Sequence, residues 1–328
     1  MLLIIVNNVA AKARQSWPRI KNELDAAGVN YQTHHTDRQG DATLQTRAAL
    51  KSGVQLIVVV GGDGTLSEAA EGFFQFNDLE IPPTPINPNA ALAILPAGTG
   101  DDFARGLRRN RAPLKEWIDT LVAFVRAGGK GQAGARQIDV LYGLCDGFQK
   151  QFICLNASTM GIGGETAGRV ASQGRFMRNF SGEFRFVFAA VGALAAWRER
   201  RVRVTVDDKT VADGPMNLVG VANGLYAGGG MMLSPDAKID DGKLDVITAS
   251  GLSRTEIVRE LARIHKGGHV KNAKVRIMQG EGVSIETFSP EDAMLIEADG
   301  NVRGMTPAEF RVMPKALRFV CGNAHRVG

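Results

Sequence analysis

The strongest constraint on the fold comes from two glycine-rich segments, each directly preceded by five apolar residues. The apolar run at residues 56–60 precedes Gly-Gly-Asp-Gly-Thr at 61–65, and the run at 91–95 precedes Pro-Ala-Gly-Thr-Gly at 96–100. An uninterrupted apolar run of this kind is typical of a strand that is covered on both faces. Helical patterns alternate with strand-like segments, at 29–34 among others, through the first third of the chain. We therefore predict a parallel α/β sheet there.

The glycine-rich segments also indicate what kind of ligand this sheet binds. Glycine lets the main chain approach a ligand closely, and the free N–H groups at the start of a helix attract phosphate. Two such turns at the carboxyl ends of strands in one sheet should converge on one crevice, the usual ligand position in an open α/β sheet. The alternative interpretation is a pair of ordinary strand–helix turns.

The established phosphate-binding motifs narrow the choice of ligand. Neither turn reads G-x-x-x-x-G-K-[ST] or G-x-G-x-x-G, so the main signals for a P-loop and for a Rossmann dinucleotide fold are absent there. An acidic residue, Asp63, lies inside the first turn. A bare carboxylate repels a polyphosphate, and it makes chemical sense when it orients a hydroxyl group or a Mg²⁺ ion bound to a nucleotide.

The rest of the chain has a different pattern. Residues 126–136 are rich in glycine and basic residues and have no periodicity, which predicts a linker. Beyond them, short strand-like segments are separated by Asp-Gly pairs, at 213–214 and 299–300 among others, which predict turns. We therefore predict an α/β nucleotide-binding domain at 1–128, with 310–328 as a segment that could complete it, and a mainly antiparallel β-sandwich domain at 136–309.

Composition and charge exclude several classes of protein. With 44% hydrophobic and 22% charged residues, the chain is globular rather than disordered. Its three cysteines are far apart and odd in number, which argues against a disulfide framework and fits a reducing cytoplasm. The first residues lack the basic region of a secretory signal, and the longest apolar run, 186–197, is too short to span a bilayer. We expect a cytoplasmic protein, and its net charge of +5 favours anionic partners.

Four segments, at 61–68, 95–105, 222–242 and 298–307, together resemble the soluble bacterial diacylglycerol kinase family. Sphingosine and ceramide kinases are relatives of that family. NAD kinases and phosphofructokinases carry turns similar to the first segment, whereas the second and third segments discriminate. The resemblance covers nearly the whole chain and implies an NAD-kinase/phosphofructokinase-like α/β domain that uses ATP and Mg²⁺.

The resemblance also implies ligand contacts. Its Mg²⁺ site corresponds to the side chain of Asp241 and the carbonyl groups of Lys238 and Lys243, where an acidic turn offers the oxygen ligands that this ion prefers. An ordinary turn with exposed acidic side chains is the alternative. The positions that match the family's ATP contacts are Asn7, Thr36, Gly61, Gly62, Asp63, Gly64, Thr65, Leu66, Ser67, Gly98 and Thr99.

The expected catalytic loop departs from the family. Residues 298–301 read Ala-Asp-Gly-Asn, where the family usually has Asp-Gly-Glu and uses that Glu to remove the proton of the substrate hydroxyl. Asn301 is an amide and cannot act as a base. A general base contributes about 10²–10⁴-fold, whereas positioning and charge stabilisation supply most of the catalysis of phosphoryl transfer. We therefore expect a slower enzyme, with Asp63, Asp299 and Asn301 in the catalytic site and Asp63, Asp299 or Glu297 as the substitute base.

A lipid acceptor, which the resemblance implies, requires a surface that meets a membrane. Arginines flank the apolar run 186–197, and another group follows the second glycine-rich turn; near anionic lipid each can contribute about 1 kcal/mol. We expect peripheral association with an anionic membrane, and a core helix with solvated arginine ends is the alternative. The absence of a recognised nucleic-acid-binding motif argues against a nucleic-acid partner, and a homodimer is left open. The arginines are Arg175, Arg178, Arg185, Arg198, Arg200, Arg201 and Arg203 in the first group and Arg105, Arg108, Arg109 and Arg111 in the second.

Together these observations predict an ATP-dependent lipid kinase that transfers the γ-phosphoryl group to a primary hydroxyl of a diacylglycerol-like lipid. Two alternatives stay open. One is a kinase that acts on a non-lipid hydroxyl. The other, motivated by Asn301, is a catalytically weak homologue that binds lipid or nucleotide.

Overall fold

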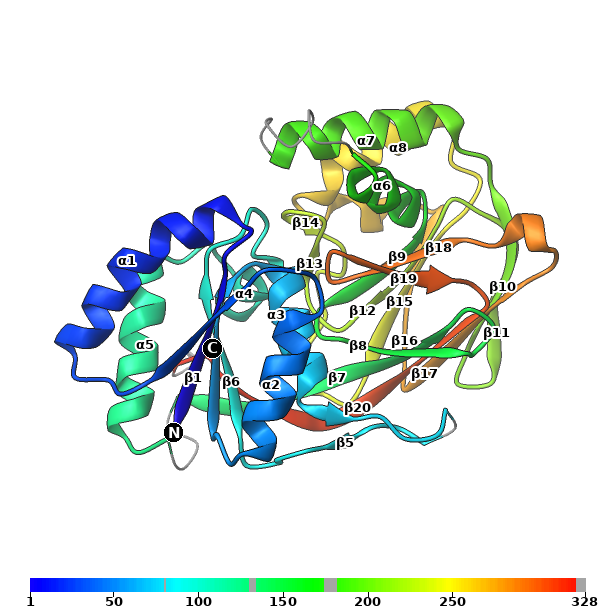
Figure 1. The fold of residues 1–328 in the computed structure, drawn as a ribbon. Helices are drawn as coiled ribbons and strands as arrows, with labels where there is room; N and C mark the ends of the chain where they lie inside the picture. Colours follow the sequence, from blue (N-terminus) through cyan, green and yellow to red (C-terminus); the bar gives the residue numbers. More distant parts are fainter. Residues whose placement is uncertain (80, 130–133, 174–181, 323–328) are drawn as a thin grey trace. The chain divides into compact units, whose positions relative to one another are not determined.

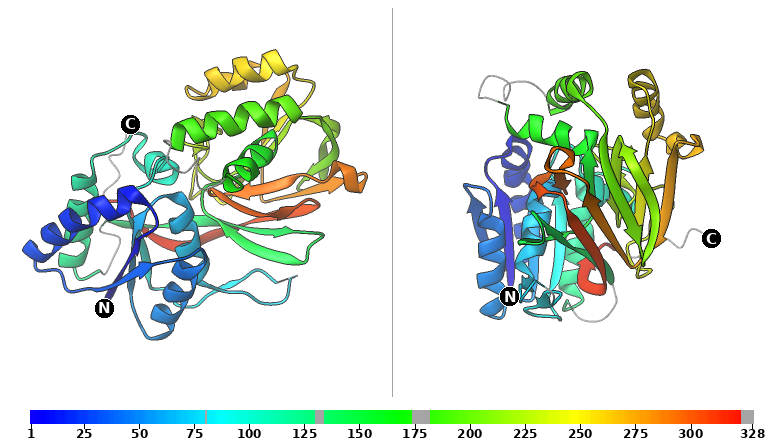
Figure 2. Two further views of the ribbon diagram at one scale, coloured as in Figure 1. Left: turned by 45° about the horizontal axis from the view of Figure 1, so that its top comes forward. Right: turned by 90° about the vertical axis from the view of Figure 1, so that its right-hand side faces the viewer.

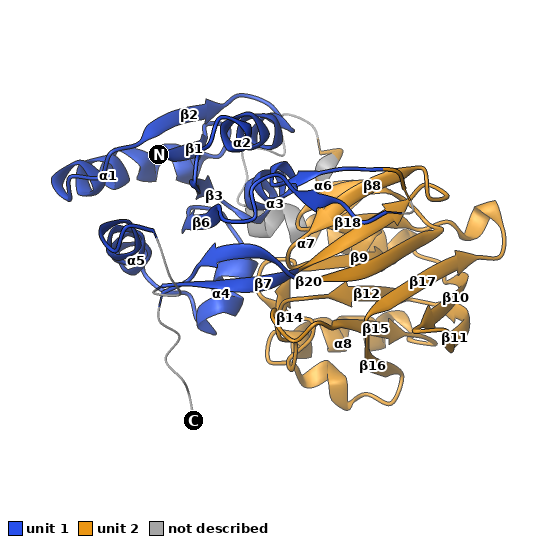
Figure 3. Ribbon diagram, turned by 90° about the horizontal axis from the view of Figure 1, so that it is seen from below, with its two compact units in different colours: residues 1–77, 81–139, 314–328 blue, residues 78–80, 140–313 orange. Residues whose placement is uncertain are grey.

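The computed structural model describes residues 1–79, 81–129, 134–173 and 182–322. The chain forms two compact units (Figure 3): residues 1–77, 81–139 and 314–328 make up unit 1, and residues 78–80 and 140–313 make up unit 2. Two long strands, β7 (Ala135–Cys145) and β20 (Ala308–Val320), contribute residues to both units. The linker predicted at 126–136 falls partly outside the described residues, and its last two residues begin β7. The domain boundaries predicted at 128, 136 and 310 stay predictions.

Unit 1 is built on a parallel sheet in the order β2-β1-β3-β6-β20. Val59 of β3 pairs with Ile5 on one side and Ile94 on the other, and all three side chains are buried. Helices α1 and α5 cover one face of the sheet and α2 and α3 cover the other (Figures 1 and 2). The strands can be apolar without interruption because neither face meets water. The parallel α/β sheet predicted from the sequence is confirmed.

The elements of unit 1 and its boundary strand are β1 (Leu2–Asn7), α1 (Ala11–Ala26), β2 (Gln32–Thr36), α2 (Asp41–Lys51), β3 (Leu56–Gly61), α3 (Asp63–Gly72), β4 (Phe74–Gln75), β5 (Thr84–Pro85), β6 (Ala91–Pro96), α4 (Asp102–Arg108), α5 (Leu114–Arg126) and β7.

The strand predicted at 29–34 is displaced, because β2 spans Gln32–Thr36. Val29 instead belongs to the end of α1, where its N–H donates to the carbonyl of Leu24 and its side chain is buried. Helix α1 ends just before Gly28, whose φ of +70° is the left-handed conformation that favours glycine after a helix. An apolar residue after a helix-ending glycine therefore packs on that helix and does not start the strand.

Unit 2 contains antiparallel sheets that enclose an apolar core. One sheet has the order β16-β15-β12-β9-β18-β19, and the other includes β11-β10-β17-β20, with β7 and β8 joined to it. The core between them includes Val204, Val221, Val246 and Phe310. The antiparallel β-sandwich predicted for this part of the chain is confirmed.

The remaining elements are β8 (Lys150–Cys154), β9 (Ala157–Gly161), α6 (Ile162–Ala171), α7 (Gly182–Ala196), β10 (Arg200–Val206), β11 (Lys209–Met216), β12 (Leu218–Ala222), β13 (Tyr226–Ala227), β14 (Met231–Met232), β15 (Leu244–Ala249), α8 (Arg254–Ile264), η2 (Gly268–Lys271), β16 (Val275–Gly280), β17 (Gly282–Thr287), η3 (Pro290–Asp292), β18 (Leu295–Ala298), β19 (Asn301–Met305) and β20.

The prediction of a turn at residues 213–214 is wrong. Both residues lie inside β11, where Gly214 pairs with Val202 of β10. The hairpin that joins β10 to β11 turns at Asp207 and Asp208, whose φ angles are +44° and +66°. A two-residue hairpin loop of this kind requires positive φ, and aspartate tolerates it better than most side chains.

Among the described residues, no helix has both the length and the apolar character needed to cross a membrane.

Candidate functional site

The two glycine-rich turns lie against each other in unit 1. Strands β3 and β6 are neighbours, Gly61 pairs with Pro96, and the N–H of Ala97 donates to the carbonyl of Gly61 at 2.9 Å. A Cβ atom on Gly98 would lie 2.5 Å from the Cα atom of Gly62, a separation that real Cβ atoms do not reach. Both turns therefore need glycine here, and the predicted convergence of the two loops is present in the structure.

The ends of two more strands lie at the same edge of the sheet. Asn7, the last residue of β1, pairs with Thr36, the last residue of β2. The Nδ2 atom of Asn7 donates to Oγ1 of Thr65 at 2.7 Å, and its Oδ1 accepts from the N–H groups of Val9 and Ala10. Asn7 thus shapes the turn after β1 and ties that turn to the first glycine-rich segment.

Helix α3 begins inside the first glycine-rich segment. Its N-cap residue is Gly62, so no side chain caps the helix start. The helix carries ten residues, and the positive end of its dipole is at Asp63. Leu66 and Ser67 are buried in the body of the helix, while Gly62 and Gly64 are half-buried. An anion at this edge would therefore meet main-chain groups, and Leu66 and Ser67 would support the helix from within.

Asp63 holds the two glycine-rich segments together. Its two carboxylate oxygens accept from the N–H groups of Asp102 and Phe103, each at 3.0 Å, at the start of α4. Desolvation of the carboxyl group raises its pKa to about 7, with help from the neighbouring Asp102 and Asp101 carboxylates and against the two N–H donors. A carboxyl group with so perturbed a pKa, at the edge where the strands end, is a candidate functional residue.

Asp299 lies in unit 2 and serves as a main-chain anchor. It occupies the turn between β18 and β19 with φ at +50°, and it is buried. Its carboxylate accepts from the N–H groups of Leu155 at 2.7 Å and Asn156 at 2.9 Å, and Sγ of Cys154 donates to it at 3.4 Å. These bonds fix the segment before β9, so the structure gives Asp299 a positioning role, and its catalytic role stays a prediction.

Asn301 and Glu297 lie on either side of the same hairpin. Asn301 is the first residue of β19, where it pairs with Ala298 and is half-buried. Glu297 accepts from Oγ1 of Thr159 at 2.9 Å and from the N–H of Gly300 at 2.5 Å. Both carboxylate oxygens of Glu297 thus bind donors of unit 2, which makes this residue a poorer candidate for the missing base than its sequence position indicates.

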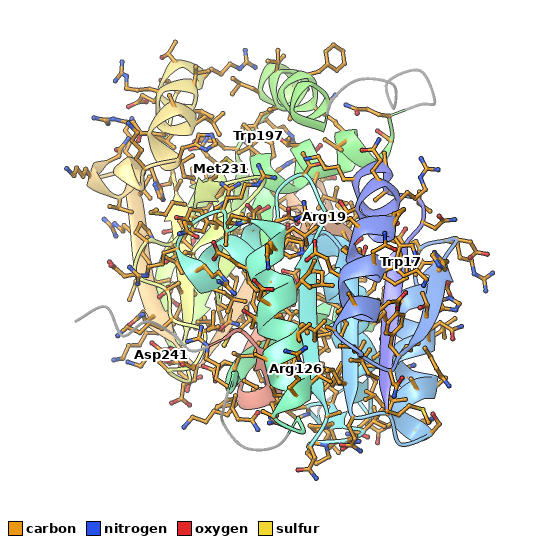
Figure 4. All side chains as sticks on the ribbon, turned by 90° about the vertical axis from the view of Figure 1, so that its left-hand side faces the viewer. Trp17, Arg19, Arg126, Trp197, Met231 and Asp241 are labelled. Atoms are coloured by element: carbon orange, nitrogen blue, oxygen red, sulfur yellow. The ribbon has the colours of Figure 1, made fainter. Side chains whose placement is uncertain are left out.

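The predicted metal site is a surface turn before β15. Gly242 has φ at +75°, and the exposed Asp241 (Figure 4) accepts from the N–H of Lys243 at 3.1 Å. Asp245, four residues further on, is buried, and burial raises its pKa. One carboxylate and two carbonyl oxygens suit a hard cation such as Mg²⁺, so the residues present fit the ion. Its binding at Asp241, Lys238 and Lys243 stays a prediction.

Two buried asparagines were not among the predicted site residues. Nδ2 of Asn156 donates to the carbonyl of Tyr226 at 2.6 Å, and Nδ2 of Asn223 donates to the carbonyl of Leu155 at 2.8 Å. A Cβ atom on Gly224 would lie 2.1 Å from Oδ1 of Asn156. Asn223 lies in one of the four segments that carry the family resemblance, and its place in that segment was the only sequence feature that could have indicated it. Together with Asp299, these residues fix the loops at one end of the sheet.

Two family models match most of the chain. The model described as the diacylglycerol kinase catalytic domain matches residues 1–127, and the model described as the YegS C-terminal NAD kinase beta sandwich-like domain matches residues 160–321. These matches correspond largely to the α/β sheet and to the β-sandwich. A fold of this class, with glycine-rich turns at the ends of parallel strands, is that of a kinase that uses a nucleotide.

Individual relatives agree with the family models. A probable lipid kinase, YegS-like, from Stenotrophomonas maltophilia is 31% identical over 241 residues, which cover 74% of this chain and 71% of that protein. A diacylglycerol kinase of Bacillus subtilis is 26% identical over 292 residues, which cover 89% and 86%. The crystal structure of a putative diacylglycerol kinase from Bacillus anthracis has the same fold, with a TM-score of 0.71 at 22% identity over 98% of this chain and 95% of that one.

The chain belongs to the family of soluble bacterial diacylglycerol kinases and YegS-like lipid kinases. It is thus a lipid kinase, a phosphotransferase whose acceptor is an alcohol. The family assignment confirms the resemblance seen in the four sequence segments.

Proposed function

We propose that this kinase transfers the γ-phosphoryl group of ATP to a primary hydroxyl of a diacylglycerol-like lipid. The single observation that carries the proposal is the close approach of Gly62 and Gly98, which puts two glycine-rich turns at one edge of the sheet. Main-chain N–H groups at such an edge suit a polyphosphate. The names of the relatives support diacylglycerol as the acceptor class.

In this mechanism the chain's own residues chiefly position the reactants. The start of α3 faces the phosphates, Asn7 fixes the turn beside them, and Asp63 fixes the second turn through α4. Mg²⁺, when bound to the nucleotide, neutralises charge on the phosphoryl group that is transferred. In-line transfer to the hydroxyl needs no phosphoenzyme, because positioning and charge stabilisation supply most of the rate.

A catalytically weak homologue is the second candidate function, and Asn301 favours it. An amide at this position cannot accept the proton of the acceptor hydroxyl. The neighbouring carboxylates, Asp299 and Glu297, already accept hydrogen bonds from groups of unit 2. The two candidates differ in turnover and agree in binding, so an assay must measure both.

An acceptor panel separates the candidates. ADP release is measured with ATP, with and without Mg²⁺, against diacylglycerol, monoacylglycerol, phosphatidylglycerol, sphingosine and soluble alcohols. We expect diacylglycerol-like lipids to stimulate ADP release well above the lipid-free rate. Stimulation by soluble alcohols alone contradicts a lipid acceptor. Binding of magnesium nucleotide in calorimetry without turnover on any acceptor identifies the weak homologue.

We also propose that two neighbouring helices of unit 2 meet an anionic membrane. Phe188 and Val191 of α7 are 59% and 63% exposed, and Val258 and Leu261 of α8 are 54% and 37% exposed. Both helices run along the same side of unit 2 (Figures 1 and 2), and Arg254 of α8 donates to the carbonyl of Ala195 in α7 at 3.0 Å. Exposed apolar side chains beside arginines suit the interface of an anionic bilayer.

Several of the arginines that the sequence indicated for this role already have hydrogen-bond or ion-pair partners within the protein. Arg198 and Arg200 donate to the carbonyl of Glu291, and Arg203 forms ion pairs with Asp213 and Glu286. The side chains of Arg175, Arg178 and Arg185 lie outside the described residues. On α8, Arg254 and Arg259 are exposed beside Val258, and Arg254 also donates to the carbonyl of Ala195. Charge for an anionic surface is therefore available next to the apolar side chains of α8.

Vesicle flotation tests this surface. We expect the wild type to float with vesicles that contain phosphatidylglycerol, and the variant F188E/V191E to remain in the soluble fraction. Leu44→Glu is the matched control, because Leu44 on α2 is also 54% exposed and lies in unit 1. Equal flotation of F188E/V191E and the wild type, or wild-type binding that is indifferent to salt and anionic lipid, contradicts the proposal.

A further inference from the structure

The third family segment contains a small hairpin that turns on three glycines. Strands β13 and β14 pair with each other, with Ala227 opposite Met231 (Figure 4). Between them, residues 228–230 are glycines with φ of +61°, +88° and +107°. Glycine has no side chain with which to anchor a turn, and it loses more conformational freedom on folding than any other residue. Contacts from other parts of the chain are therefore needed to fix residues 226–233, which we call the glycine hairpin.

The end of α8 and the short helix η2 bind the second strand of the glycine hairpin. Nδ1 of His265, the residue that follows α8, lies 3.1 Å from the carbonyl oxygen of Gly230. Nε2 of His269 in η2 lies 3.0 Å from the carbonyl oxygen of Leu233. A carbonyl oxygen can only accept a hydrogen bond, so each of these ring nitrogens carries a hydrogen. The two histidines thus bind the main chain immediately before and immediately after β14.

Gly267, between α8 and η2, brings this corner of the chain close to the glycine hairpin. Its φ is +68°, and a Cβ atom here would lie 2.9 Å from Cγ of Pro235 and 3.1 Å from Sδ of Met232. Leu233 is buried in an apolar cluster against which Ile264, at the end of α8, also packs. The corner and the hairpin are therefore joined by close packing as well as by hydrogen bonds.

The surroundings of His269 suit a residue that holds a main-chain group and does not react. The side chain is 3% exposed, so its ring is shielded from a substrate. Its Nδ1 atom and Oε2 of Glu260 are buried and have no hydrogen-bond partner within the described part of the chain. Burial lowers the pKa of His269, against the opposing effects of the Leu233 carbonyl and the charge of Glu260. The ring is therefore neutral near pH 7, with its hydrogen on Nε2.

The first strand of the glycine hairpin is bound to the loop that Asp299 anchors. Nδ2 of Asn156 donates to the carbonyl of Tyr226 at 2.6 Å. The main-chain N–H of the same asparagine donates to the carboxylate of Asp299 at 2.9 Å. A series of contacts within unit 2 therefore runs from His269, through both strands of the hairpin and Asn156, to the turn that precedes Asn301.

We propose that His269 is a positioning residue for the lipid kinase reaction, because it fixes the glycine hairpin and, through that hairpin, the loop of Asp299 beside which the acceptor hydroxyl reacts. His265 supports the same hairpin from the other end of β14. The inference rests on the proposed function in one respect, since the catalytic place of Asp299 and Asn301 belongs to that proposal. The first test below therefore needs no turnover.

Native-state hydrogen exchange measures whether His269 fixes the Asp299 loop. His269→Leu removes the donor, and His269→Gln keeps an N–H donor on a side chain of similar reach. We expect the N–H groups of Leu155 and Asn156, which Asp299 binds, to exchange roughly tenfold faster in His269→Leu and at the wild-type rate in His269→Gln.

The matched control for this exchange experiment is Asn272→Ala. Asn272 ends the same corner, but its side chain donates to Glu260 of α8 at 3.1 Å and not to the hairpin. Exchange at Leu155 and Asn156 should therefore stay at the wild-type rate in this variant. Unchanged exchange in His269→Leu overturns the proposal, and so does equal acceleration in Asn272→Ala, which would indicate general loosening of unit 2.

Kinetics separate positioning from stability. We expect His269→Leu to lower kcat for ADP release with diacylglycerol by roughly tenfold to a hundredfold, the loss that a misplaced loop causes. Nucleotide affinity in calorimetry should stay unchanged, because the predicted nucleotide contacts lie in unit 1. His269→Gln should restore most of kcat.

Three outcomes of the kinetic test are distinct. A wild-type kcat in a folded His269→Leu protein overturns the proposal. A parallel loss of nucleotide affinity overturns it as well, since a merely structural role would weaken the whole molecule. Absence of turnover by the wild type on every acceptor counts against the proposed function instead, and the exchange rates at Leu155 and Asn156 then decide whether His269 fixes the loop.

Discussion

At the scale of single residues, the acidic side chains near the glycine-rich turn and the β18–β19 hairpin bind main-chain N–H groups. Asp63 binds the start of α4, and Asp299 binds the segment before β9. Hydrogen bonds from main-chain N–H groups to a carboxylate are stronger than those between neutral groups, so such a carboxylate fixes the geometry of the loop that donates them. Residues of this kind look catalytic in sequence because they lie in functional loops, and their bonding shows that they also position those loops.

We predict that Asp63→Asn abolishes phosphoryl transfer. An amide can accept one of the two N–H groups of α4, but its own NH₂ group then faces the other donor, so the second glycine-rich turn loses its fixed position. Misplacement of a loop by about 1 Å can cost a factor of roughly 100 in rate. ADP release and nucleotide calorimetry measure the loss, with Asp119→Asn, an exposed partner of Lys115, as the control. A fully active Asp63→Asn enzyme contradicts the assignment.

We predict that Asn301→Glu preserves or raises the rate of transfer. A carboxylate at this position supplies the base that the family usually has there, and a general base contributes about 10²–10⁴-fold. The matched control is Asn301→Gln, which adds the same length without a carboxylate and should not raise the rate. A drop in rate with Asn301→Glu in a correctly folded protein would show that the chain has adapted to an amide at this position.

The raised pKa of Asp63 predicts a pH dependence of stability. In the folded state the pKa of this carboxyl group is raised from its ordinary value of 3.8 to about 7, so the folded protein keeps the proton to a higher pH than the unfolded chain does. The stabilisation from the bound proton is present at low pH and is lost as pH rises from about 4 to 7, by at most about 1.4 kcal/mol per pH unit. Urea unfolding at pH 5, 6, 7 and 8 should show the wild type losing stability relative to Asp63→Asn up to pH 7 and no further. A constant difference contradicts the raised pKa.

At the scale of elements, the site depends on how two strand–turn–helix units fit together. Strands β3 and β6 pair in register, and this pairing carries their following turns into contact at Gly62 and Gly98. Cations from α1, α4 and the turn before α5 then bind the outer carbonyl groups of the second turn. The turn is therefore fixed from Asp63 on one side and from the three cations on the other.

We predict that Gly98→Ala destabilises unit 1 and removes nucleotide binding. The added Cβ atom would lie 2.5 Å from the Cα atom of Gly62 and 2.6 Å from Oδ1 of Asp101, so the main chain must move. Overpacking of this kind typically costs about 1–3 kcal/mol. Urea unfolding and nucleotide calorimetry give the two readouts. Gly220→Ala in β12 is the control, since its nearest contacts would be ordinary ones at 3.4–3.5 Å. Wild-type nucleotide affinity in Gly98→Ala contradicts the proposed fit of the loops.

At the scale of the whole molecule, the last described strand completes the first sheet. Residues 318–320 of β20 pair in parallel with residues 91–93 of β6. Phe319 is fully buried, and its ring lies 5.0 Å from that of Phe103, edge to face, on the helix that follows the second glycine-rich turn. A residue near the end of the chain thus supports a site built mainly from the first third of the sequence.

We predict that Phe319→Ala destabilises the protein by about 3–5 kcal/mol, the range for loss of a buried phenylalanine. The same substitution should weaken nucleotide binding, because α4 loses the ring against which Phe103 packs. Urea unfolding measures the first effect and calorimetry the second. The control is Phe288→Ala, because Phe288 is 49% exposed and should cost far less. A Phe319→Ala protein with unchanged stability would show that β20 does not support this unit.

The sequence by itself determined the elements whose signal is local. The apolar runs that became β3 and β6 form strands within one residue of the predicted bounds. Glycine next to such a run is a local requirement as well, so both turns could be found without the structure. The four segments that carry the family resemblance also predicted the kind of kinase. They could do so because the family is recognised from residues in several elements and not from any single one.

The tertiary structure alone decided which groups meet. The displaced β2 and the missed hairpin at Asp207 and Asp208 depend on packing and strand register, which neighbouring residues in sequence do not encode. The bonds from Asp63 to α4 and from Asp299 to the segment before β9 join residues 39 and 143–144 positions apart. A hydrogen bond acts over about 3 Å in space whatever the separation along the chain. For this reason the residue types of the site could be read from the sequence, and the partners of those residues could not.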